Sequence, residues 1–402
     1  MSAEVENEEC EYTDLFLEMA VDPAAPWERY QVLVERGVVE KGVGKVLMAS
    51  RAAVEAACRN PKVFAIDEAG LFMGNVRSFK PQGIDPPLQT KYRKILDPLF
   101  APKKMDLLDA DVAARVNQFI DGFIDRGECN FTEEFAIPFP SSVFLTLMGL
   151  PYEDLDLLLR FKDDILRPGS TRGELLTDPQ ERLQFQLNTG QEIYAYYDAL
   201  LDERQKSPQD DILTHLLQAE IDGDRLTRED VLDVCFHFLL AGLDTVTDNL
   251  TCFFAFLVQH TDYRLQLVEN PAIIPSAVEE LLRWESVVPA GMRRATEDVE
   301  VLGCPIKAGT AVSLGWAPSN IDPAQFPDPL EVRFDRQPNR HFAFGAGVHR
   351  CLGSHLARRE LRVTLREWHR RIPEYSLKPG SKLEYQSLMR SVENLMLVWP
   401  TG

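Results

Sequence analysis

Apolar residues recur at helical spacing along much of the chain. Regular apolar stripes indicate amphipathic helices from about Asp109 to Ile124 and from Leu187 to Glu203, and a shorter helix from Pro275 to Trp284. A further helical pattern begins near Leu352 and continues toward the C-terminus. Helices therefore dominate the predicted structure.

The segment from Thr227 to about Gln259 has a different pattern, because its middle is apolar on nearly all sides. Thr227 is a suitable N-cap, and Glu229 and Asp230 place acids in the first turn, where they favour a helix. A helix without a polar face lies inside a protein. The sequence thus predicts one long helix through the centre of the molecule.

Between Thr296 and Leu314 apolar and polar residues alternate, which indicates short strands joined by turns. The following segment, from Asn320 to Asn339, is rich in Pro and Asp and is expected to be irregular. Neither a repeat nor a linker is visible, so residues 1–402 are expected to form one domain. The predicted fold class is mainly α with a minor β part.

The composition excludes several classes of partner and cellular location for the protein. The chain of 402 residues has a formal net charge of −20, which argues against nucleic acid and an anionic membrane surface as partners. An apolar run of about 18 residues, as a transmembrane helix needs, is absent from the sequence. The first ten residues lack the basic and apolar regions of a signal peptide, so a cytoplasmic protein is expected. The 7 cysteines form no CxxC pair, so a zinc cluster is not expected.

One cysteine stands in a neighbourhood that suits chemistry. Residues 344–353 read Phe-Gly-Ala-Gly-Val-His-Arg-Cys-Leu-Gly. Gly345 and Gly347 allow positive φ and a close approach to a flat group. Cys351 lies where this loop leads into the helix near Leu352, and the free N–H groups and dipole of a helix N-terminus stabilise a thiolate. Such a thiolate is a candidate iron ligand, which N–H groups aimed at the sulfur would tune.

The centre of the long predicted helix reads Ala241-Gly242-Leu243-Asp244-Thr245. Gly inside a helix costs about 1 kcal/mol relative to Ala, so another interaction should offset it. Ala241 and Thr245 share one face, where small residues leave room for a planar ligand and a diatomic molecule. Thr245 can also bond to the carbonyl four residues earlier and loosen the helix. An acid and an alcohol in an apolar surround can deliver protons to oxygen, which makes Asp244 and Thr245 the candidate catalytic pair.

Both motifs resemble those of the cytochrome P-450 superfamily: the first its heme-binding loop, the second its Ala/Gly-Gly-x-Asp/Glu-Thr signature. The resemblance extends from about Asp85 to the C-terminus and is closest to the soluble bacterial type. Gly-Leu-Asp-Thr-Val and His-Leu-Ala-Arg-Arg-Glu-Leu are similar to the camphor-hydroxylating branch. The resemblance implies the single-domain fold of this family, with heme b between the long central helix and the loop whose Cys351 binds the iron.

The resemblance also implies which other residues hold the cofactor. Arg293, Arg93 and His349 are similar to family residues that bind the heme propionates. These residues are needed because a buried carboxylate requires hydrogen-bond donors. Many family members have a histidine where Gln89 stands, and Gln89 can donate a hydrogen bond but cannot carry charge. The residues expected to bind heme are Gln89, Arg93, Ala241, Arg293, Phe344, Gly345, His349, Cys351 and Gly353.

Glu280 and Arg283 place a carboxylate and a guanidinium on one helix face, at i and i+3. They resemble the structural Glu-x-x-Arg pair of the family, which a second arginine from the irregular segment completes. Arg336 is the first choice for this arginine, and Arg340 is the alternative. We assign this triad to folding rather than to chemistry.

The substrate pocket is expected above the heme, beside Thr245. Its walls are mostly apolar, which favours a hydrophobic small molecule: a terpenoid, fatty acid, steroid or aromatic compound. Arg77, in the loop that would cover the pocket, is expected to face solvent; contact with a carboxylate or a carbonyl is the alternative. The expected walls are Leu240, Ala241, Val288, Pro289, Leu388, Met389 and the loop from Leu71 to Gly83.

The chain has no flavin or iron–sulfur motif, so electrons should come from a separate ferredoxin and ferredoxin reductase. Arg350, Arg358, Arg359 and Arg362 surround the Cys loop and would dock an acidic ferredoxin; scattered solvated arginines are the alternative. The predicted activity is insertion of one atom of O2 into the substrate. The alternatives are a peroxide-driven hydroxylase on the same fold and a non-catalytic heme protein that senses gas or carries electrons.

Overall fold

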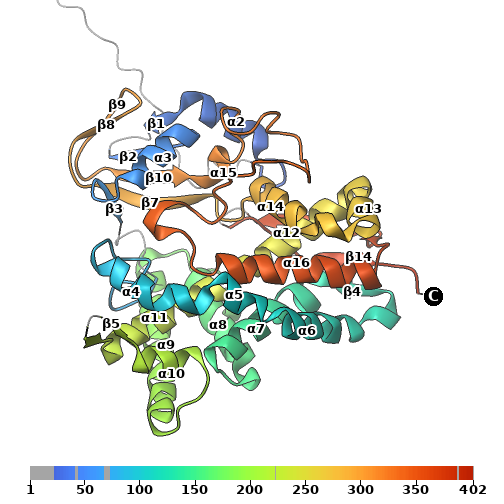
Figure 1. Ribbon diagram of the computed structural model, residues 1–402, viewed down its shortest axis with the longest axis horizontal. Coiled ribbons are helices and arrows are strands. Elements are labelled where there is room, and N and C mark those ends of the chain that lie inside the picture. The colour runs from blue at the N-terminus through green and yellow to red at the C-terminus, as the bar shows by residue number, and fades with distance from the viewer. Residues whose placement is uncertain (1–21, 41–43, 68–72, 222, 387–388, 402) are drawn as a thin grey trace, which may run out of the picture.

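The computed structural model describes residues 22–40, 44–67, 73–221, 223–386 and 389–401. Helices make up most of this part of the chain, and a five-stranded sheet lies to one side of them (Figure 1). The α-helices are α2 (Trp27–Arg36), α3 (Arg51–Arg59), α4 (Leu88–Leu96), α5 (Pro102–Asp106), α6 (Asp109–Asp121), α7 (Pro138–Met148), α8 (Leu155–Leu166), α9 (Pro179–Lys206), α10 (Ile212–Gln218), α11 (Arg228–Gly242), α12 (Thr245–Gln259), α13 (Thr261–Glu269), α14 (Ile274–Glu285), α15 (Trp316–Ser319) and α16 (Ser354–Arg371).

The five-stranded sheet has the strand order β1-β2-β10-β7-β3, and smaller sheets lie elsewhere. Strand β10 runs parallel to β2 and antiparallel to β7, with Val312 opposite Val46 and Arg293. The strands are β1 (Val38–Glu40), β2 (Lys45–Met48), β3 (Phe64–Ile66), β4 (Glu128–Asn130), β5 (Glu220–Ile221), β6 (Asp224–Arg225), β7 (Ala290–Ala295), β8 (Val299–Val301), β9 (Cys304–Ile306), β10 (Ala311–Gly315), β11 (Ser376–Leu377), β12 (Glu384–Gln386), β13 (Ser391–Glu393) and β14 (Met396–Val398). The predicted fold class, mainly α with a minor β part, is confirmed.

The prediction of one continuous helix from Thr227 to Gln259 is wrong. Helix α11 ends at Gly242, and α12 begins at Thr245. Phe144 of α7 packs so closely on Gly242 that a Cβ there would lie 2.5 Å from the phenyl ring. Gly242 therefore provides room for Phe144, and the helix is interrupted directly after this contact.

The two halves of the broken helix belong to different hydrophobic clusters. Buried residues of α11 pack with α7, α8, α9 and α10 in one cluster. Buried residues of α12 pack with α14 and α16 in the other. The junction at Leu243 and Asp244 therefore lies where the two clusters meet.

None of the helices in the described ranges is long and apolar enough to cross a membrane. The N-terminal segment, for which we expected no signal peptide, lies outside the described residues, as does Cys10. The irregular segment is found as predicted: between Asn320 and Asn339 the backbone forms turns and bends without a helix or strand.

Candidate functional site

The loop before α16 carries Cys351 at its end. Gly345 and Gly347 have φ angles of 64° and 71°, which favour glycine. The Cys351 N–H donates to the Phe344 carbonyl at 2.9 Å and closes the loop. A Cβ at Gly347 would lie 2.8 Å from the Cys58 carbonyl oxygen, so close packing against α3 also requires glycine there. The loop is therefore held in one shape by its own backbone and by α3.

Cys351 has an exposed side, although protein encloses the rest of its side chain. Burial raises the pKa of its thiol. The Gly353 N–H and the guanidinium groups of Arg93, Arg350 and Arg358 lower this pKa by a smaller amount. Helix α16 begins three residues later. The sulfur thus lies at a helix N-terminus with an N–H and positive charges around it, a setting that stabilises a metal-bound thiolate.

The junction between α11 and α12 carries the predicted catalytic pair. Asp244 is buried, and its carboxylate pairs with Lys162 Nζ at 3.0 Å and Arg167 Nη2 at 3.4 Å. The Thr245 hydroxyl donates to the Ala241 carbonyl at 3.2 Å, as its spacing predicts. Ala241 is exposed although most of α11 is buried. The junction therefore has one open side, which Ala241 marks.

Sequence reasoning missed Lys162 and Arg167, which lie 82 and 77 residues before Asp244. The only local signal is the place of Lys162 in α8, where it shares the buried stripe with Leu158 and Ile165. A lysine on the apolar side of an amphipathic helix needs a buried carboxylate, but the sequence does not say which one.

Arg293 on β7 is the predicted propionate residue with the clearest need for an anion. It is 6% exposed, and no carboxylate within the described ranges forms an ion pair with it. Its Nη1 donates to the Met292 carbonyl at 2.6 Å. Burial lowers the pKa of its guanidinium, and Cys58 and Asp85 act against this. A buried guanidinium without a carboxylate suits an anionic ligand.

Arg93 and Gln89, on α4, contact the Cys loop instead. Arg93 donates to the Arg350 carbonyl at 2.7 Å and pairs with Asp97 at 2.6 Å. Gln89 is buried and donates to the Val348 carbonyl at 2.7 Å. Both side chains therefore hold the loop from the side of α4, and the Gln89 amide is already engaged by protein.

His349 lies in the same loop and is buried against Asp85. Its Nε2 lies 3.0 Å from Asp85 Oδ1, while Asp85 Oδ2 accepts from the Ile66 N–H at 2.9 Å. Burial acts to raise the pKa of Asp85, but the bonds from His349 and the Ile66 N–H lower it. Among the residues described, none bonds to the buried Nδ1 of His349. One ring nitrogen is thus left for another group.

These positions fit a heme b group. Leu352 packs on the cluster that contains α11, and Phe344 packs on the cluster that contains α12, so the Cys loop contacts both hydrophobic clusters. Phe344, Gly345 and Gly353 are half-buried, and Cys351 is exposed. Iron would meet the thiolate, and Arg293 would receive a propionate.

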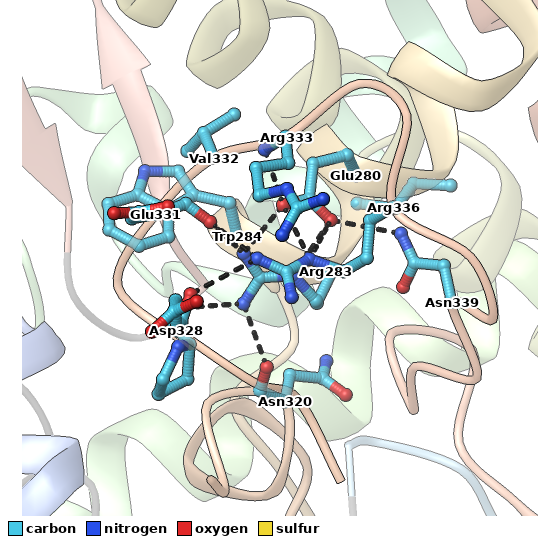
Figure 2. Close-up of polar contacts among 12 residues, drawn as sticks. Glu280, Arg283, Trp284, Asn320, Asp328, Glu331, Val332, Arg333, Arg336 and Asn339 are labelled. Atoms are coloured by element: carbon cyan, nitrogen blue, oxygen red, sulfur yellow. Dashed lines mark hydrogen bonds and ion pairs between the residues drawn. The ribbon is translucent and has the colours of Figure 1, made fainter.

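Glu280 on α14 is the centre of a buried polar cluster (Figure 2). Its carboxylate accepts from Arg283 at 2.8 and 2.9 Å, from Arg336 Nε at 3.0 Å and from Asn339 at 3.0 Å. The side chains of Glu280 and Arg283 are 0% exposed. Arg336 thus completes the pair, whereas Arg340 is exposed.

The predicted pocket residues differ in their accessibility. Leu240 and Pro289 are buried, Val288 and Met389 are half-buried, and Ala241 is exposed. An open cavity of ≈ 570 Å³ lies elsewhere, lined by α6 and α7 and the segments beside them, and none of the five residues lines it. No predicted catalytic or heme-binding residue lines it either, so we assign it no part in the site.

The loop expected to cover the pocket is described only in part. Leu71 lies outside the described residues, as does Leu388. The Arg77 side chain is 36% exposed, and its Nε also binds both carboxylate oxygens of Asp233, at 2.9 and 3.0 Å. The Asp233 side chain is fully buried in α11 and requires a cation.

The arginines near the Cys loop form ion pairs. Arg358 and Arg362 bind Glu279 of α14 at 2.8 and 3.0 Å, and Arg359 binds acids of α5 and α6. Arg350 is exposed. The ion pairs neutralise part of the positive charge that we expected on this face.

Three comparisons relate the chain to known proteins. The family Cytochrome P450 matches residues 174–382. Probable cytochrome P450 127A1 of Sinorhizobium fredii is 34% identical over 321 residues, 79% of this chain and 74% of that protein. Steroid C26-monooxygenase of Mycolicibacterium smegmatis is 30% identical over 325 residues, 79% of this chain and 78% of that protein.

Among solved structures, CYP109E1 from Bacillus megaterium in complex with testosterone superposes with a TM-score of 0.86. The two chains are 25% identical, and the match covers 94% of this chain and 99% of the other. The chain therefore belongs to the cytochrome P450 family, whose members are monooxygenases that bind heme b.

Proposed function

We propose that this protein is a heme-thiolate monooxygenase in which Cys351 binds the iron and one atom of O2 enters a hydrophobic small molecule. The observation that carries the proposal is the setting of Cys351, exposed before α16 with the Gly353 N–H bonded to its sulfur. Arg293 and the free Nδ1 of His349 would bind the propionates. When bound, the heme supplies the redox chemistry that activates dioxygen.

We assign proton transfer to Asp244 and Thr245. Reduction of one oxygen atom to water consumes two protons, which must cross an apolar interior. The Thr245 hydroxyl, bonded to the Ala241 carbonyl, is oriented at the open side of the junction. Lys162 and Arg167 fix the neighbouring carboxylate. Asp244 would receive protons and pass them to the Thr245 hydroxyl.

For the substrate we favour a steroid-like molecule. Two proteins similar to this chain point to that class: the steroid C26-monooxygenase by its name, and CYP109E1 by its bound testosterone. The predicted walls Leu240, Ala241, Val288, Pro289 and Met389 offer the apolar surface that such a ligand needs. Three other substrate classes stay predictions: terpenoids, fatty acids and aromatic compounds. The resemblance to the camphor-hydroxylating branch also stays a prediction.

A separate ferredoxin and its reductase are the proposed electron donors, docking near the exposed Arg350. The test is turnover of a steroid panel in two arms: ferredoxin, reductase and O2 in one, peroxide alone in the other. Oxidised product in the first arm supports the proposal. Product with peroxide alone would identify the peroxide-driven hydroxylase, and neither product nor a ligand-induced shift of the heme absorption band would identify a sensor or carrier.

The iron ligand needs its own measurement. The reduced protein with carbon monoxide should show the absorption maximum of a thiolate-bound heme, and Cys351→Ser should lose it. Cys58→Ser is the matched control. Cys58 lies beside the same loop, but it is near the C-terminal end of α3 rather than at the N-terminus of a helix. A thiolate-type maximum that survives in Cys351→Ser would contradict the assignment.

A further inference from the structure

A closed group of charges surrounds the Asp244 carboxylate. Lys162 Nζ lies 3.0 Å from Asp163 Oδ1 and 3.0 Å from Asp244 Oδ1. Arg167 binds the same two acids, Asp163 at 3.0 Å and Asp244 at 3.4 Å. Two cations thus balance two carboxylates, and the group as a whole is neutral. Because both cations hold the Asp244 carboxylate, another group has to supply the proton that Asp244 passes on.

One turn further along α12 lies a third acid, Asp248. It is 3% exposed, and its Oδ2 is buried with no hydrogen-bond partner among the described residues. Nor does any cation in the described ranges form an ion pair with it. Because Lys162 and Arg167 are already balanced by Asp163 and Asp244, an ionised Asp248 would be an uncompensated buried charge, which is strongly unfavourable.

The groups around Asp248 agree with a neutral acid. Burial and the charge of Asp244 raise the pKa of Asp248, while Arg167, Lys162 and the Ser391 hydroxyl of β13 lower it by less. On its own helix, Cys252 faces it as a thiol whose pKa burial also raises. The Asp248 N–H donates to the Asp244 carbonyl at 2.9 Å, so the two acids lie one turn apart, and the charge of the Asp244 carboxylate acts on Asp248. Neighbouring carboxyl groups exchange a proton directly or through one water.

We infer that Asp248 is a positioning residue that stores a proton beside the oxygen-reducing site and gives it to Asp244. The inference rests on the proposed role of Asp244 and Thr245. In the step, the O–H bond of Asp248 breaks and an O–H bond forms on Asp244. Asp248 is left as a carboxylate, which the charges of Lys162 and Arg167 balance once Asp244 is neutral. Asp244 then gives the proton to the Thr245 hydroxyl oxygen while that hydroxyl releases its own proton toward the oxygen atom that is reduced to water, and a proton from solvent restores Asp248.

The test compares the wild-type holoenzyme with Asp248→Asn, which keeps the shape but has no transferable acid proton. At neutral pH the wild type should show the infrared carbonyl band of a protonated, buried carboxylic acid, and Asp248→Asn should lack it. Asp248→Asn should lower kcat by about tenfold or more with KM unchanged. Heme content and the ligand-induced spectral shift should not change. Cys252→Ala, on the same buried face, is the control that alters packing without removing an acid.

Two results would overturn the inference: the absence of this band from the infrared difference spectrum between the wild type and Asp248→Asn, or an unchanged kcat in Asp248→Asn. The difference spectrum is needed because burial also favours the protonated form of Glu360, whose band is common to both proteins and cancels. Failure of the proposed function is seen separately, because Thr245→Ala would then couple electrons to product as well as the wild type does. If Thr245→Ala loses coupling of electrons to product while Asp248→Asn keeps the kcat of the wild type, Asp248 has no part in proton transfer but Asp244 and Thr245 keep theirs.

Discussion

Arg336 donates from its Nε to both carboxylate oxygens of Glu280, at 3.0 and 3.2 Å, across 56 residues of sequence. The Arg336 side chain is 5% exposed, and the irregular segment that carries it has no helix or strand of its own. The carboxylate therefore joins this segment to α14. Its position close before the Cys loop makes the pair important for the stability of the site.

Arg336→Met should lower the free energy of unfolding by about 3 kcal/mol, because it leaves a buried carboxylate with one cation fewer. Arg340→Met is the matched control, since that arginine is exposed, and its effect should stay within about 0.5 kcal/mol. Urea unfolding followed by fluorescence measures both. Equal effects of the two substitutions would contradict the assigned partner.

Lys162→Met tests the buried pair with Asp244. Both side chains are 5% exposed, so removal of the cation should cost about 3 kcal/mol of unfolding free energy. Lys307 and Asp298 form a pair at 2.8 Å that is largely exposed, and Lys307→Met should leave the urea midpoint unchanged. If Lys162→Met is as stable as Lys307→Met, burial does not determine how much an ion pair contributes to the unfolding free energy.

Thr245→Ala should retain heme but divert reducing equivalents to hydrogen peroxide, because the hydroxyl that orients proton transfer is lost. The measurement is peroxide formed per reductant consumed. Thr247→Ala is the control: this buried hydroxyl donates to the Ala136 carbonyl at 2.8 Å, so its loss should reduce stability and leave coupling intact. The proton-transfer assignment fails where Thr245→Ala couples as well as the wild type.

Arg293→Leu and Arg294→Leu separate cofactor binding from stability on the same strand. Arg293 has no carboxylate partner in the described ranges, whereas Arg294 binds Asp67 at 2.8 Å. Arg293→Leu should weaken heme binding by about tenfold or more without destabilising the heme-free chain, because it removes an unpaired buried charge. Arg294→Leu should leave heme affinity unchanged. Heme transfer to an acceptor protein measures the affinity of each variant.

The pH dependence of stability should differ in sign between two acids of α16. Burial raises the pKa of Glu360 well above the ordinary 4.5. For Glu367, burial acts in the same sense, but bonds from Asn117, Arg366 and Arg370 lower its pKa. A raised pKa in the folded state means that the folded protein holds the proton more tightly, so stability is lost as pH rises above 4.5. A lowered pKa adds stability above 4.5 that is lost as pH falls.

Glu360→Gln should therefore become more stable than the wild type as pH rises from 5 to 8, with the difference vanishing toward 4.5. Glu367→Gln should be less stable than the wild type over the same range. Urea midpoints at each pH measure both trends. The same direction of change in the two variants would contradict the assigned environments.

The local sequence pattern predicted the bounds of a helix well where an apolar stripe runs along its whole length. It missed the helical turns that are exposed to solvent. The predicted Pro275–Trp284 differs from α14 by one residue at each end. The predicted start at Leu187 lies eight residues inside α9, which begins at Pro179 after the N-cap Asp178. Those first turns are mostly exposed, so no apolar stripe marks them, and only the cap could have signalled the true start.

Partners distant in sequence could not be predicted from local patterns, and Arg336 was assigned to Glu280 only through the family resemblance. The motifs around Cys351 and Asp244 indicated which chemistry to expect, because they hold their functional groups within a few residues. Gly242, directly before the break, packs on Phe144, and Asp244 pairs with Lys162. Such contacts are set by the packing of whole helices, and one sequence does not contain a local sign of them.

The break between α11 and α12 has a consequence for how the protein opens. Each half is anchored in its own hydrophobic cluster, and the helical hydrogen-bond pattern is interrupted between them. Unfolding of one half therefore need not propagate along the helix into the other. Amide hydrogen exchange in α11 and α12 should report two separate opening free energies, with the proton-carrying residues at the boundary between two cooperative units.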